Sequence, residues 1–152
     1  MRQSIKQCVM ATLALIIPSV SQAKDNDDDG KVCRDSTLHG LYVFNASGFN
    51  IVGGIAQPKA IVELIRFNGD GSLTVPAATV SINGTVTRSP PNGTGSYTVG
   101  PDCTGSLVFG PPLAAPGPAY DLFVEFGGSE LQMIQTGPGS PVFQGTAERL
   151  SR

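Results

Sequence analysis

From residue 33 onward, the chain alternates between short segments rich in apolar side chains and clusters of glycine, proline and asparagine. This pattern predicts β-strands joined by tight turns, because alternating positions along a strand face opposite sides of a sheet. We find no convincing 3.6-residue repeat of an amphipathic helix in this part of the sequence. The predicted strand segments are residues 41–46, 60–67, 72–75, 79–87, 94–99, 104–109, 119–126, 130–136 and 142–150.

The connections between these segments are nearly all of hairpin length. Residues 68–71, Asn-Gly-Asp-Gly, suit the positive φ angles of a tight turn. Pro76 predicts a bend or a sheet edge between the two segments that flank it, so we count about eight strands. Strands joined in this way favour an all-β fold, an antiparallel up-and-down barrel, and eight strands can enclose one small ligand. A two-sheet β-sandwich is the alternative.

The first 23 residues have the three parts of a secretory signal peptide. Residues 1–8 are basic, residues 9–17 are apolar and end at Pro18, and residues 21–23 (Ser-Gln-Ala) suit a cleavage site. Nine apolar residues are too few for a membrane-spanning helix, which needs about 20. We therefore predict a periplasmic or secreted protein that has no membrane segment after cleavage.

The rest of the chain divides into a short leader and one domain. Residues 24–32 form a predicted acidic, disordered leader, and residues 33–152 form a single predicted β-barrel domain. The acidic tract has the first half of a calcium-loop pattern but lacks the glutamate at its twelfth position, so we expect no metal ion and no cofactor. The formal net charge of −2 offers no basic face for nucleic acid.

Cleavage would leave two cysteines, Cys33 and Cys103. In an oxidising compartment, an even pair in a small domain predicts a disulfide rather than two free thiols.

One segment carries a recognisable motif. Residues 95–107 run Gly-Ser-Tyr-Thr-Val-Gly-Pro-Asp-Cys-Thr-Gly-Ser-Leu. They resemble the motif Gly-x-Tyr-x-Val-x-x-Asp-Cys-Thr-Gly-x-Leu of largely uncharacterised exported bacterial β-barrel proteins. Cys33 with residues 38–44, and the turn at residues 67–73, resemble other parts of the same proteins. This resemblance spans the domain and implies the Cys33–Cys103 pairing, but it implies little about function.

The strand plan is also similar, more loosely, to lipocalin-like and allene-oxide-cyclase-like barrels. The sequence departs from the lipocalin pattern in its first strand, where Gly40-Leu41-Tyr42 stands in place of Gly-x-Trp.

Few side chains could support catalysis. A single histidine, His39, argues against a nucleophilic triad or a zinc site. Glu63 interrupts an apolar strand, and burial inside a barrel would raise its pKa and suit it to proton transfer. We expect the more common outward orientation for this residue. Asp121 and Glu125 share one strand face and are the other carboxylate candidates.

Three functions remain open from the sequence. The favoured one is a barrel that binds a small, fairly apolar molecule in its lumen, with candidate contacts from Tyr42, Tyr97, Tyr120 and Phe123. The second is a cofactor-free isomerase or cyclase that works by enclosing its substrate. The third is a structural or surface protein without a pocket. A cavity above roughly 300 Å³ beside Glu63 would support the first two. The oligomeric state is open.

Overall fold

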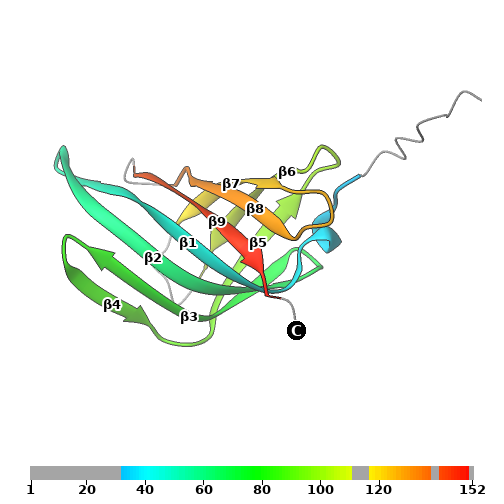
Figure 1. The fold of residues 1–152 in the computed structure, drawn as a ribbon, viewed down its shortest axis with the longest axis horizontal. Helices are drawn as coiled ribbons and strands as arrows, with labels where there is room; N and C mark the ends of the chain where they lie inside the picture. The colour runs from blue at the N-terminus through cyan, green and yellow to red at the C-terminus, as the bar shows by residue number, and fades with distance from the viewer. Residues whose placement is uncertain (1–31, 111–116, 138–140, 151–152) are drawn as a thin grey trace, which may run out of the picture.

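The computed structural model describes residues 32–110, 117–137 and 141–150. The predicted signal peptide and nearly all of the acidic leader lie outside this part. The described chain forms a short 3₁₀ helix and nine strands (Figure 1). These are η1 (Asp35–Thr37), β1 (His39–Val52), β2 (Ile55–Asn68), β3 (Ser72–Ile82), β4 (Thr85–Ser89), β5 (Gly93–Val99), β6 (Thr104–Phe109), β7 (Ala119–Val124), β8 (Glu130–Gln135) and β9 (Val142–Arg149).

Eight of the strands close an antiparallel barrel. Their hydrogen-bonded order is β2-β1-β9-β8-β7-β6-β5-β3, and pairing between β2 and β3 closes the ring. The extra strand, β4, pairs with the second half of β3. The all-β, up-and-down barrel that the sequence predicts is therefore confirmed, and the sandwich alternative is wrong. No helix in the described ranges is long and apolar enough to cross a membrane.

The first two strands are about twice as long as the sequence pattern suggests. β1 and β2 pair continuously from His39–Asn68 to Val52–Ile55. Pairing between β1 and β9 ends earlier, at Phe49 and Val142, so the tip of the β1–β2 hairpin extends beyond the barrel wall. Figure 1 shows this hairpin and the β3–β4 hairpin reaching out at one end of the barrel. We call this the open end.

β3 continues through Pro76 instead of stopping there. The register between β2 and β3 shifts between Leu64 and Arg66, which leaves two residues of β3 opposite one of β2. This bulge accommodates the missing N–H of proline, in line with the predicted bend. Asn83 and Gly84 form the turn into β4, so residues 79–87 are two strands and not one.

The opposite end of the barrel is plugged, and we call it the closed end. The Cys33–Cys103 disulfide, with 4.9 Å between the two Cα atoms, ties the segment before η1 to the β5–β6 turn. The Val99 amide donates a 2.7 Å hydrogen bond to the Asp35 side chain in η1. The turn between β7 and β8 also contacts η1: Gly128 packs so closely that a Cβ at this position would lie 2.2 Å from the Thr37 carbonyl oxygen.

An aromatic cluster fills the barrel behind this plug. The Phe67 ring makes edge contacts with Tyr42 and Tyr97, at centroid distances of 5.1 and 4.9 Å. The Tyr97 hydroxyl accepts a hydrogen bond from the Gly69 amide and lies 3.0 Å from the Leu38 carbonyl oxygen. The Tyr42 hydroxyl donates to the Gly128 carbonyl. These partners fix both tyrosines in a structural role at the closed end.

Candidate functional site

Glu63 points into the barrel, against our expectation of an outward orientation. Ile61, Ile65 and Phe67 share its face of β2 and are buried. Because Phe67 is fixed in the closed-end cluster, strict alternation carries Glu63 to the interior as well. Its side chain is only 4% exposed, and it is the one charged side chain buried among the described residues.

Glu63 lines a cavity of about 170 Å³ at the open end. The walls are mostly apolar: Ile61 of β2, Ala78, Val80 and Ile82 of β3, Phe109 of β6 and Pro118, with Lys59, Ser89 and Tyr120 completing them. Ala78 lies directly opposite Glu63 in the β2–β3 register, and its small side chain helps to leave this space open. The cavity is smaller than our 300 Å³ criterion but similar to a 150 Å³ engineered cavity that binds benzene.

The environment of Glu63 favours its neutral form. Burial raises the pKa of Glu63 from 4.5 to about 8, and the positive charge of Lys59 offsets only part of this rise. At neutral pH the carboxyl group is therefore mostly protonated, and it can donate a hydrogen bond as well as accept one. Burial, together with the nearby Glu63, also raises the pKa of the Tyr120 hydroxyl.

Lys59 lies at the entrance of the cavity, and its ammonium group contacts the side chains of Gln135 and Phe143. Its Nζ donates a 3.2 Å hydrogen bond to the Gln135 side chain and lies 4.1 Å from the centre of the Phe143 ring. Burial lowers the pKa of Lys59. Among the described residues, the Glu63 carboxyl has no salt bridge or hydrogen bond, and no fully buried side-chain nitrogen or oxygen lacks a hydrogen-bond partner. The carboxyl oxygens of Glu63 are therefore open to the cavity, where they can interact with a bound molecule.

The sequence-based candidates separate into three places. Glu63 and Tyr120 both line the cavity, where the Tyr120 ring makes edge-to-face contacts with Phe44 and Phe109. Tyr42 and Tyr97 lie in the closed-end cluster, as described above. The remaining candidates have exposed side chains and do not line the cavity: Asp121, Phe123 and Glu125.

Sequence reasoning did not find Lys59, Ala78 or Phe109 as site residues. Lys59 and Glu63 are both odd-numbered positions of β2, so the period-2 pattern would have placed them on one face. Ala78 and Phe109 carry no such signal, because their part in the site depends on which strands become neighbours when the barrel closes.

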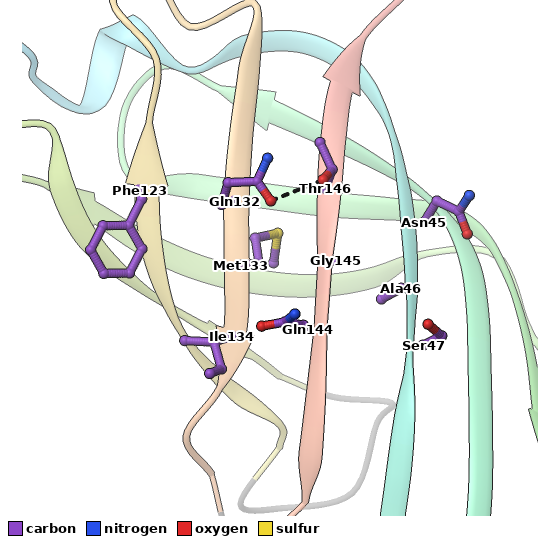
Figure 2. A pocket seen from close by; sticks show the side chains of 10 residues that line it. All are labelled: Asn45, Ala46, Ser47, Phe123, Gln132, Met133, Ile134, Gln144, Gly145 and Thr146. Atoms are coloured by element: carbon purple, nitrogen blue, oxygen red, sulfur yellow. Dashed lines mark hydrogen bonds between the residues drawn. The ribbon is translucent and has the colours of Figure 1, made fainter.

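A second hollow, of about 490 Å³, lies on the outer surface of β1, β7, β8 and β9 (Figure 2). Its wall is rich in uncharged polar side chains, including Asn45, Gln132, Gln144 and Thr146, and Phe123 lies at its β7 border. The Thr146 hydroxyl donates a 2.9 Å hydrogen bond to Gln132. None of its lining residues is an acid or a base. This hollow therefore offers hydrogen bonds but no group for proton transfer.

Comparisons with protein-family models, curated proteins and solved structures found no match for this chain. Within the residues that the structure describes, no group of three or more His, Cys, Asp or Glu side chains could hold a metal ion. The disulfide is typical of proteins in oxidising compartments outside the cytoplasm.

Proposed function

We propose that this barrel binds a small, mostly apolar molecule in the open-end cavity, with one polar group of that molecule placed on Glu63. The observation that carries the proposal is a carboxyl group on a residue that is only 4% exposed, which lines an apolar cavity and has no hydrogen-bond or salt-bridge partner among the described residues. Burying such a group costs free energy unless it is hydrogen-bonded, and an apolar residue would fill the space at lower cost. Local violations of this kind are expected at functional sites.

The size and chemistry of the cavity limit which ligands can fit. A volume of about 170 Å³ suits a compact molecule with one ring or a short branched chain. Protonated Glu63 would donate to a hydroxyl or carbonyl oxygen of the ligand, and the Tyr120 hydroxyl lines the same cavity. The Cys33–Cys103 disulfide supports a periplasmic or secreted location for this binding.

One observation favours a second function, a cofactor-free isomerase or cyclase. A pKa of about 8 lies close to neutral pH, where a group exchanges protons most effectively, and Tyr120 lines the same cavity. The binding proposal needs only the hydrogen bond, whereas the enzyme proposal also needs turnover. The cavity counts against the third alternative, a structural protein with a completely filled core.

A matched pair of variants tests the binding proposal. Ala78→Leu would fill the cavity opposite Glu63, whereas Ala77→Leu adds the same atoms to the neighbouring exposed position. Phenol, indole and cyclohexanol serve as probes in ligand-observed NMR. We expect saturation transfer to the probes with the natural protein and Ala77→Leu, and its loss with Ala78→Leu. Equal signals from both variants would contradict binding in the cavity.

A second comparison tests the role of Glu63. Phenol carries the polar group that toluene lacks, so phenol should bind more tightly to the natural protein. Glu63→Leu should remove this preference while toluene still binds. A preference for phenol that survives in Glu63→Leu would assign the polar contact to another residue. Native mass spectrometry of protein purified from its own host would then give the mass of the natural ligand.

A further inference from the structure

The tip of the β1–β2 hairpin is unusually apolar for a segment that reaches into solvent. Residues 40–58 contain no charged side chain, and the tip lies within this stretch. Phe49, Val52 and Ile55 are 45%, 51% and 68% exposed, and Val142, the β9 neighbour of Phe49, is 65% exposed. Hairpin tips in water are normally polar, and a cluster of exposed apolar side chains marks an interaction surface.

This apolar tip continues the wall of the cavity. Val52 and Ile55 are cross-strand partners, so they lie on the same face of the hairpin. Ile55 also shares the β2 face that carries Lys59 and Ile61, which line the cavity. Figure 1 shows the β1–β2 hairpin projecting from the end where the β3–β4 hairpin also extends. A surface that covers the tip would therefore also face the cavity entrance.

The described charged residues are distributed unevenly between the two ends. Six acids lie in η1, in the closed-end turns or at the strand ends beside them: Asp35, Asp70, Asp102, Glu125, Glu130 and Glu148. Arg34, Arg66 and Arg149 also lie at or beside this end, whereas Lys59 and Arg88 lie in the open half, where Glu63 is buried and mostly protonated. Asp121 lies on the outer wall of β7. Among the described residues, acids therefore outnumber lysines and arginines by six to three at the closed end, whereas the open half has Lys59, Arg88 and the apolar β1–β2 tip, and its exposed acids are few.

We propose that the open end docks on the surface of a lipid bilayer. Phe49, Val52 and Ile55 would insert among the headgroups, and the low number of exposed acids in the open half would allow it to approach a surface that contains anionic lipid. The cavity entrance would then face the bilayer, from which an apolar ligand can be taken up or to which it can be delivered. The ligand-transfer part of this inference rests on the proposed function, but the docking itself does not.

Flotation with vesicles of phosphatidylcholine and phosphatidylglycerol tests the docking. Val52→Asp is compared with Val62→Asp, because Val62 is similarly exposed, at 55%, but lies on the outer barrel wall. We expect the natural protein and Val62→Asp to float with the vesicles, and Val52→Asp to partition about tenfold less, since it loses the burial of one valine side chain. Equal partitioning of both variants, or no flotation of the natural protein, would overturn the proposal.

Two controls distinguish membrane docking from ligand binding in the cavity and from self-association of the hairpin tip. Phenol binding without vesicles should persist in Val52→Asp, whereas Ala78→Leu should lose phenol binding but still float, so the two proposals fail independently. Sedimentation velocity without vesicles tests whether the tip binds a second copy of the chain instead. Concentration-dependent dimers that Val52→Asp abolishes would assign the tip to self-association and overturn membrane docking.

Discussion

The two ends of this barrel use the same strands in different ways. At the closed end, the rings of Tyr42, Phe67 and Tyr97 pack edge to face, and the hydroxyl groups of the two tyrosines have hydrogen-bond partners. The disulfide ties the segment before η1 to the β5–β6 turn. At the open end, the Glu63 side chain is buried beside a cavity and has no hydrogen-bond partner among the described residues, and the hairpin tip is apolar and exposed. The closed end has the features of a stable core, and the open end has those of a binding site.

A single strand shows the change from one end to the other. The inward residues of β2 run from Phe67 and Ile65 in the packed half to Glu63, Ile61 and Lys59 in the open half. The backbone pairing is continuous along β2, so the difference lies in the side chains and in what stands opposite them. The predictions below test this division, from the largest expected effect to the smallest.

The largest difference is expected between two isoleucines on the same face of β2. Ile65 is fully buried, and Ile61 borders the cavity. Ile-to-Ala changes in cores cost about 2–5 kcal/mol, and the cost rises with the packing that is lost. Urea unfolding should place Ile65→Ala in the upper half of that range and Ile61→Ala near its lower end. A reversed order would contradict a packed closed end and an open cavity.

The disulfide should stabilise the closed end by a similar or slightly smaller amount. Replacing Cys33 and Cys103 together by alanine should lower the free energy of unfolding by about 2–4 kcal/mol. The same variant should still bind phenol under conditions in which it is folded, because the bridge lies at the end away from the cavity. A change below about 1 kcal/mol in urea unfolding would show that η1 is held mainly by its hydrogen bonds.

Glu63 should make the free energy of unfolding of the protein depend on pH. Folding raises its pKa from 4.5 to about 8, so the folded protein keeps a proton that the unfolded chain has released. The free energy of unfolding should therefore fall as pH rises through this window. Between pH 5 and pH 7 the natural protein should lose about 2 kcal/mol relative to Glu63→Gln. Parallel pH profiles of the two proteins would contradict a buried, protonated Glu63.

Local patterns in the sequence were enough to predict the barrel and its bridge. The strands and the Asn68–Gly71 turn are determined by patterns of a few neighbouring residues. The disulfide follows from the pairing of the two cysteines that remain after cleavage. The length of β1 and β2 was missed because residues 47–59 mix glycine, proline and apolar side chains without clear alternation. Their extension is stabilised by pairing with each other, which is a tertiary effect.

The candidate site was only partly predictable. The period-2 pattern places Glu63 with Ile61 and Ile65, but it does not tell which face becomes the interior, because that depends on how the sheet closes. The same pattern already separates Tyr120 from Phe123 on opposite faces of β7, and the structure buries the first and exposes the second. The space opposite Glu63 depends on Ala78, which becomes its neighbour only through the β2–β3 pairing.

The most direct test of the account is a titration of the Glu63 carboxyl itself. Protein labelled with ¹³C in its glutamate side chains would be followed by NMR across neutral pH, with the Glu63 signal assigned by its absence in Glu63→Gln. The account predicts a midpoint of about 8 and a change in this signal when phenol is added. A midpoint near 4.5, the ordinary value for a glutamate in water, would contradict a buried acid that faces a ligand cavity.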